Sequence, residues 1–180
     1  MKQKGFAVVL IACLLIGCFG GCATKKANDP IPQWSDSVTP GDVTPSSVEK
    51  GIAFALPSVA AAPGEKIVVP VLVNADSNVA AVDFVVTYDS DAISYESFSA
   101  GLSFKAGISD ANEVKKGEIK ITMATLTPQK SEGRMCELTF RVADDAAAGE
   151  IPLNLACTTC CDYDSKPLVN QCQNGSITVK

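Results

Sequence analysis

Histidine is absent from this 180-residue sequence, and aromatic residues are scarce. Without histidine, the chain lacks the side chain that most often serves as general base and as metal ligand. Only 6% of the residues are aromatic, so few rings are available for stacking on sugars or bases, and the net charge of −5 disfavours nucleic acid as a partner. Neither a glycine-rich phosphate loop nor a nucleophile elbow occurs, and no paired carboxylates lie beside aromatic residues. We therefore expect no enzyme activity, no cofactor and no bound metal.

The sequence also lacks an apolar run long enough to span a bilayer. Two lysines precede about 13 mostly apolar residues (5–17), the length of the apolar region of a signal peptide. The tetrapeptides LIGC, ending at Cys18, and FGGC, ending at Cys22, are similar to the bacterial lipobox, whose cysteine becomes lipidated. Cys18 fits the pattern better at its first position, Cys22 is the alternative, and an ordinary cleaved signal peptide is a third reading. Residues 1–22 therefore predict export and attachment to a bacterial membrane or cell surface by a lipid anchor only.

Residues 23–50 contain proline, serine, threonine, aspartate and asparagine with few apolar groups. Such a composition cannot bury enough surface to offset the entropy of ordering, so we expect an extended linker. Residues 51–180 remain, which is a suitable length for one domain.

From residue 51 onward, short apolar runs alternate with turn signals at roughly ten-residue spacing, and no helical period is sustained. This pattern predicts an all-β sandwich. Residues 82–88, VDFVVTY, alternate most clearly between inward apolar side chains and the outward Asp83, Val85 and Thr87. Because this outward side carries no long charged side chain, we interpret it as a surface that contacts another molecule.

Three further segments alternate in the same way. In residues 66–74, Pro70 lacks a backbone donor and predicts an edge strand or a bulge. Residues 118–126 and 134–142 are expected to place their polar and small side chains outward. Those outward side chains are Lys120, Thr122, Ala124, Glu137, Thr139 and Arg141.

Four of these segments, taken in order, resemble a cohesin module, the receptor half of the cohesin–dockerin pair in cellulosome scaffoldins. They are GEKIVVPVLV, VAAVDFVVTYDSDAI, LTFRVADDAAAGEIPLNL and NGSITVK. The resemblance covers about residues 52–180 and implies a nine-stranded jelly roll of two facing sheets, a scaffold related to carbohydrate-binding modules. It further implies a non-catalytic surface module that anchors a dockerin-bearing protein, for example in polysaccharide degradation. Direct carbohydrate binding and a purely structural surface lipoprotein are the alternatives.

The resemblance also implies a contact surface on the outer face of one sheet. The matching strands are residues 79–88, 118–126 and 134–142, and the implied contacts are their outward residues. These are Asp83, Val85, Thr87, Lys120, Thr122, Ala124, Glu137, Thr139 and Arg141. The family's central strand carries an Asn-x-Asp pair, and this sequence keeps the aspartate as Asp83 but has Ala81 in place of the asparagine.

The domain contains five cysteines, which an exported protein exposes to an oxidising compartment. An Asp-Ser pair midway between Cys157 and Cys172 suits a hairpin turn, so we predict a disulfide between these two cysteines. Cys160 or Cys161 paired with Cys172 is the alternative, and Cys136 is expected as a buried free thiol. A zinc site built from the last four cysteines is the other reading of this spacing, and oxidation in the exported protein disfavours it.

Overall fold

The structure is a computed structural model, and it describes residues 51–75, 79–101, 104–126 and 133–180. The predicted signal segment, residues 1–22, and the predicted linker, residues 23–50, lie outside the described residues. No helix in the described ranges is long and apolar enough to cross a membrane. The described strands are β1 (Ile52–Ala55), β2 (Ser58–Ala61), β3 (Lys66–Ala75), β4 (Ala81–Tyr88), β5 (Ile93–Ala100), β6 (Ile108–Lys115), β7 (Glu118–Ala124), β8 (Gly133–Val142), β9 (Gly149–Cys161), β10 (Asn170–Gln173) and β11 (Gly175–Val179).

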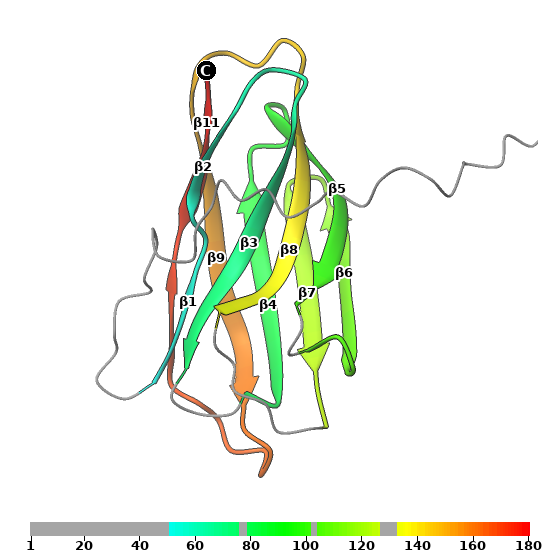
Figure 1. The fold of residues 1–180 in the computed structure, drawn as a ribbon, viewed down its shortest axis with the longest axis vertical. Coiled ribbons are helices and arrows are strands. Elements are labelled where there is room, and N and C mark those ends of the chain that lie inside the picture. The colour runs from blue at the N-terminus through cyan, green and yellow to red at the C-terminus, as the bar shows by residue number, and fades with distance from the viewer. Residues whose placement is uncertain (1–50, 76–78, 102–103, 127–132) are drawn as a thin grey trace, which may run out of the picture. The chain divides into compact units, whose positions relative to one another are not determined.

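These strands form two sheets that face each other, with β3 and β8 in front of β9, β4 and β7 in Figure 1. The five-stranded sheet has the order β10-β1-β3-β8-β5, and the six-stranded sheet has the order β2-β11-β9-β4-β7-β6. The predicted all-β sandwich is therefore confirmed.

The first and last strand segments each pass from one sheet to the other. β1 pairs in parallel with β10 in the five-stranded sheet, and β2 pairs in parallel with β11 in the six-stranded sheet. The first segment breaks at Pro57, which has no N–H for a ladder, and the last breaks at Asn174. Gly175 follows the second break, where an added Cβ would lie 2.4 Å from the carbonyl oxygen of Pro57. If each interrupted pair counts as one strand, the described residues give the nine strands expected.

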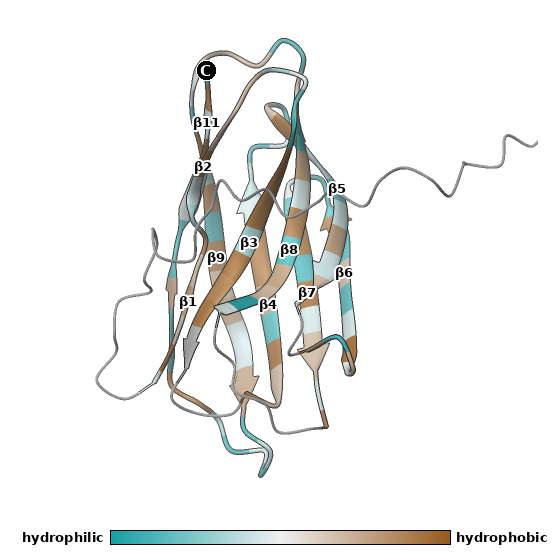
Figure 2. Ribbon diagram, viewed as in Figure 1, coloured by the Kyte–Doolittle hydropathy of each residue, from teal (hydrophilic) through white to brown (hydrophobic). Residues whose placement is uncertain are grey.

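The core is built from the inward side chains of both sheets. On β4, the alternate residues Val82, Phe84 and Val86 are at most 1% exposed. The ring of Phe84 packs edge-on against Phe54 of the opposite sheet, with ring centroids 4.8 Å apart. In Figure 2, the interior strand β3 is hydrophobic (brown) along most of its length, whereas β6 and β7 carry hydrophilic (teal) segments.

Pro70 pairs with Glu137 of β8 on one side only, because the pairing of β3 with β1 begins at Leu72. The edge reading therefore holds at Pro70 itself, although β3 is an interior strand of its sheet. The β3–β8 register shifts between Val71 and Leu72, where the extra residue is Met135 of β8, so the bulge lies on the partner strand and not on β3.

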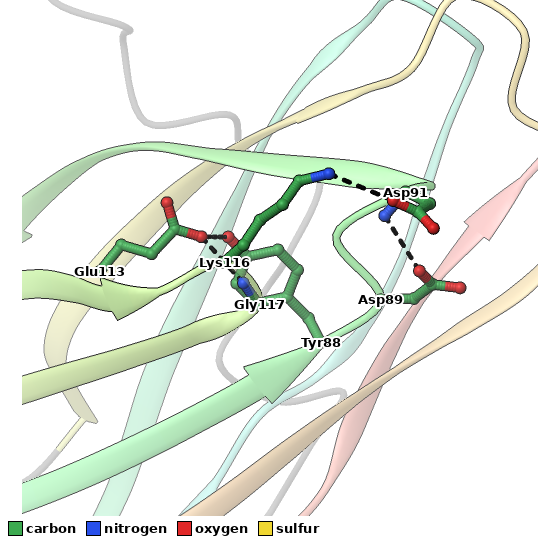
Figure 3. A network of polar contacts seen from close by, with 6 residues as sticks. All are labelled: Tyr88, Asp89, Asp91, Glu113, Lys116 and Gly117. Carbon is green, nitrogen blue, oxygen red and sulfur yellow. Dashed lines mark hydrogen bonds and ion pairs between the residues drawn. The ribbon is translucent and has the colours of Figure 1, made fainter.

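A polar network joins the end of β4 to the hairpin between β6 and β7 (Figure 3). Glu113 accepts hydrogen bonds from the hydroxyl of Tyr88 and, at 3.0 Å, from the backbone N–H of Gly117. The N–H of Tyr88 in turn donates to the carbonyl oxygen of Gly117 at 3.0 Å. Lys116 of the same hairpin reaches Asp91 at 3.2 Å. These contacts fix the hairpin against β4 and so determine the relative positions of β4, β6 and β7.

We predict that Phe84→Ala lowers the free energy of unfolding by about 3–5 kcal/mol, because it removes a fully buried ring and its contact with Phe54. Urea unfolding followed by circular dichroism measures this change. Val85→Ala, on the half-buried outer side of the same strand, is the matched control and should cost less than about 1 kcal/mol. A Phe84→Ala protein as stable as the wild type would contradict this account of the core.

The Tyr88 network also predicts a dependence of stability on alkaline pH. Burial, followed by the hydrogen bond and the negative charge of Glu113, raises the pKa of Tyr88 above its ordinary value of 10.0. The unfolded phenol therefore releases its proton at a lower pH than the folded one. The stabilisation is complete below pH 10.0 and is lost as the pH rises above that value.

Thermal melts across this alkaline range test the prediction. The melting temperature of the wild type should fall more steeply with pH than that of Tyr88→Phe, and Glu113→Gln should give an intermediate slope. Equal slopes in wild type and Tyr88→Phe would show that the hydroxyl of Tyr88 does not link folding to pH.

Candidate functional site

The outer face of the six-stranded sheet presents four cross-strand rows over β9, β4, β7 and β6. We call this surface the β4 face. Its rows, read from β9 to β6, are Thr159, Asp83, Thr122 and Asp110; Ala156, Val85, Lys120 and Asn112; Cys161, Ala81, Ala124 and Ile108; and Asn154, Thr87, Glu118 and Lys115. The alternation of β4 places these residues outward because their neighbours along each strand fill the core.

Asp83 lies in the middle of the β4 face between threonines on both neighbouring strands, Thr159 and Thr122. Its side chain is half-buried and has no hydrogen bond or ion pair within the described part of the chain. Its backbone carbonyl is occupied, since the hydroxyl of Thr158 donates to it at 3.3 Å. A carboxylate held on a rigid strand without a side-chain partner is suited to accept hydrogen bonds from another molecule.

One end of the β4 face is apolar. Ala81 and Ala124 form a flat pair on adjacent strands, and Ile108 beside them is 76% exposed. Leu126, just beyond β7, is 98% exposed. The opposite end is charged, with an ion pair of 2.8 Å between Lys115 and Glu118. Small and apolar residues beside a charged border are typical of a protein-binding surface.

Six of the nine predicted contact residues lie together on the β4 face. Asp83, Val85 and Thr87 come from β4, and Lys120, Thr122 and Ala124 come from its hydrogen-bonded neighbour β7. The structure therefore brings these six side chains into one continuous patch, and their role in binding stays a prediction.

The other three predicted contacts, Glu137, Thr139 and Arg141, do not belong to this patch. They lie on β8, which is part of the five-stranded sheet in the opposite layer. Grouping them with β4 was wrong, because alternation identifies the buried side of a strand but not the sheet that the strand joins. Glu137 is paired with Arg134 at 3.0 Å, and Arg141 with Glu96 at 2.6 Å. The hydrogen bond with Lys66, followed by that with Arg141, lowers the pKa of Glu96.

The strand that does lie next to β4 is β9, whose contribution the sequence analysis missed. From residue 151 the apolar side chains alternate only as far as Cys157, which predicts a strand that ends there, yet β9 continues to Cys161. A register shift opposite Asp83 and Phe84 interrupts the alternation there and hid the continuation. The β-branched Thr158 and Thr159 were the available signal for strand. The contribution of β6 was also missed, because this edge strand has no fully buried residue.

The cysteine-rich end of β9 folds back as predicted. The N–H of Asp162 donates to the carbonyl of Lys166 at 3.0 Å, which closes a hairpin that returns the chain toward β10. All five domain cysteines are free thiols in the structure, so the Cys157–Cys172 disulfide stays a prediction. Cys136 is buried as expected, and burial raises its pKa. The residues described include all four cysteines of the zinc reading, and they contain no group of three or more ligands placed to hold a metal ion.

Stacking surfaces for sugars are not apparent among the described residues. Their exposed large hydrophobic side chains are Ile108, Val114, Leu126 and Val169, none of which is aromatic.

The fold is shared with several solved cohesin structures. The sixth cohesin from scaffoldin B of Acetivibrio cellulolyticus, in complex with a Cel5 dockerin mutant, is 24% identical with a TM-score of 0.65, and the match covers 72% of this chain and 99% of that one. A type I cohesin–dockerin complex from Clostridium thermocellum, Coh-OlpA-Doc918, gives 21% identity and a TM-score of 0.66 with the same coverage. A non-cellulosomal cohesin from the archaeon Archaeoglobus fulgidus gives 20% identity, a TM-score of 0.65, and coverage of 72% and 91%.

No curated protein matches the sequence. The family model described as the cohesin domain matches residues 52–179, which span every strand from β1 to β11. The chain therefore belongs to the cohesin family.

Proposed function

We propose that this protein is a surface-anchored cohesin that binds a dockerin-bearing protein through the β4 face. Cohesin domains are non-catalytic binding modules. The observation that carries the proposal is Asp83, a central half-buried carboxylate without a side-chain partner in the described part of the chain. The solved complexes named above, in which similar folds are bound to dockerins, give the class of partner.

The proposed contact set keeps the six predicted residues on β4 and β7 and adds their neighbours on β9 and β6. In the row of Asp83 these neighbours are Thr159 and Asp110, and in the row of Val85 they are Ala156 and Asn112. Ala81 replaces the asparagine of the family's polar pair, so Asp83 would act with the threonines beside it. The apolar end around Ile108 would bury the hydrophobic part of the partner, and the charged end would steer its approach.

We further propose that residues 1–22 direct export and that Cys18, or alternatively Cys22, carries the lipid. Residues 23–50 would then act as a tether that holds the domain away from the membrane. The dockerin-bearing partner would be a polysaccharide-degrading enzyme retained at the cell surface. Export would also expose the domain's cysteines to oxidation, which supports the predicted disulfide between Cys157 and Cys172.

Matched substitutions on the two sheets test the binding face. Thr122→Arg, in the middle of the β4 face, should weaken binding to a dockerin-bearing protein at least about tenfold, because the long side chain blocks close approach. Thr139→Arg makes the same change on the outer side of the five-stranded sheet and should leave binding unchanged. Asp83→Ala should also weaken binding, through loss of the central acceptor.

The partner is first captured from a lysate of the source organism with the wild-type domain, with and without a calcium chelator, and identified by mass spectrometry. Affinities of the variants are then measured by calorimetry. Captured proteins that all lack a dockerin would contradict the proposed partner, and greater sensitivity to Thr139→Arg than to Thr122→Arg would contradict the proposed face.

Metabolic labelling with a palmitate analogue in a bacterial host tests the anchor. Cys18→Ala should abolish the label and leave the signal segment uncleaved, whereas Cys22→Ala should retain both label and cleavage. The reverse result would show that Cys22 is the lipidated residue. Cleavage without label in the wild-type protein would show that the protein is exported by an ordinary signal peptide and is not lipidated.

A further inference from the structure

Cys157 and Cys160 belong to a Cys-x-x-Cys sequence at a bulge in β9. In a regular strand, residues three apart point to opposite faces. Here β9 contains one extra residue, Thr158, opposite the step from Asp83 to Phe84 of β4. As a result, Cys157 pairs with Phe84 and Cys160 pairs with Val82. Both partners are core residues, and both cysteines therefore face the interior.

Cys172 approaches the same place from the other sheet. It lies on β10 in register with Phe54, and Phe54 packs on Phe84, the partner of Cys157. The hairpin between β9 and β10 brings the two strands together, since the N–H of Leu168 donates to the carbonyl of Cys160 at 2.9 Å. The three cysteines thus meet at one edge of the interior.

Cys157 interacts with both other cysteines of this group. The thiol of Cys157 donates a hydrogen bond to the carbonyl oxygen of Thr159 at 3.3 Å, and its interaction with the Cys160 thiol raises the pKa of Cys157 and lowers the pKa of Cys160. The thiol of Cys172 interacts with the backbone of Cys157, and burial raises the pKa of Cys172 to about 11. Cys161 faces the other side of β9, in register with Ala81 on the β4 face, and Cys136 is buried in the five-stranded sheet.

We propose that Cys157, Cys160 and Cys172 form one redox cluster in which Cys157 is the shared partner. On oxidation, Cys157 forms a disulfide with Cys172 that links the two sheets, and Cys160 is the thiol that can displace Cys172 from it. The proposal relies on the proposed export only for the oxidising conditions in the cell.

The chemistry balances with a small disulfide such as oxidised glutathione as the oxidant. Its S–S bond breaks, the thiols of Cys157 and Cys172 give up two protons and two electrons to form their own S–S bond, and two molecules of reduced glutathione leave. In the exchange step, the thiolate of Cys160 attacks the sulfur of Cys157. The Cys157–Cys172 bond breaks, and Cys172 leaves as a thiolate that takes up a proton.

The position of the cluster gives the exchange a structural consequence. The Cys157–Cys172 bond would join β9 to β10 and so connect the six-stranded sheet to the five-stranded sheet. The Cys157–Cys160 bond would instead link two residues of β9 across the bulge. Thr158, between them, donates a hydrogen bond to the backbone carbonyl of Asp83. The two disulfides therefore differ in whether they stabilise the whole sandwich.

Peptide mapping of the purified full chain tests the proposal. The protein is equilibrated with oxidised glutathione, unfolded in acid with an alkylating agent, and digested with a protease that cleaves before aspartate. Cleavage before Asp145, Asp162 and Asp164 separates Cys172 from the other members of the cluster, while Cys136 falls on another peptide. The wild type should give a Cys157–Cys172 cross-link, and its melting temperature should rise by roughly 5–10 °C over the reduced form.

Single substitutions then distinguish the shared partner. Cys172→Ala should convert the product to an internal Cys157–Cys160 bridge without the rise in melting temperature, and Cys157→Ala should leave no disulfide in the cluster. Cys161→Ala is the matched control and should behave as wild type. A Cys160–Cys172 bridge in Cys157→Ala, or no bridge in Cys172→Ala, would overturn the proposal, and melts under reducing conditions verify that each variant is folded. Because no partner protein is used, failure here leaves the proposed binding function untouched.

Discussion

Burial of alternate side chains between two facing sheets is the interaction on which the rest of this structure depends. Phe84 of β4 packs on Phe54 of the opposite sheet, and both rings are at most 1% exposed. Because the period of a strand is two, burying Val82, Phe84 and Val86 necessarily turns Asp83 and Val85 outward. The same alternation therefore produces both the core and the binding surface.

Local patterns in the sequence were sufficient for the all-β sandwich and for the outward direction of six residues of the candidate site. Strands such as β4 and β7 have one fully buried side, so their outward residues follow from the alternation alone. The hairpin after β9 could also be predicted, because its turn residues lie midway between Cys157 and Cys172.

Pairing between strands could not be predicted from local pattern, since it depends on contacts that are distant in the sequence. β8 alternates as clearly as β7, yet it joins the other sheet, which removed Glu137, Thr139 and Arg141 from the site. β9 was cut short because its bulge shifts the alternation by one residue at Thr158. A bulge places two residues of one strand opposite one residue of its partner, so its position depends on the partner strand. The sequence of β9 alone therefore does not predict it.

The parallel pairing of the first and last strands has a consequence for when the domain can fold. Ser176 of β11 donates a hydrogen bond to Ser58 of β2 at 2.9 Å, across 118 positions of the chain. β10 likewise completes the edge beside β1. A ribosome releases the chain from its N-terminus, so until β10 and β11 have emerged the five-stranded sheet lacks its edge strand and β2 lacks its partner in the six-stranded sheet. Contacts this distant also close slowly. The nascent domain therefore stays incompletely folded until these two strands have been made, and an incompletely folded polypeptide can still be threaded through a narrow membrane pore.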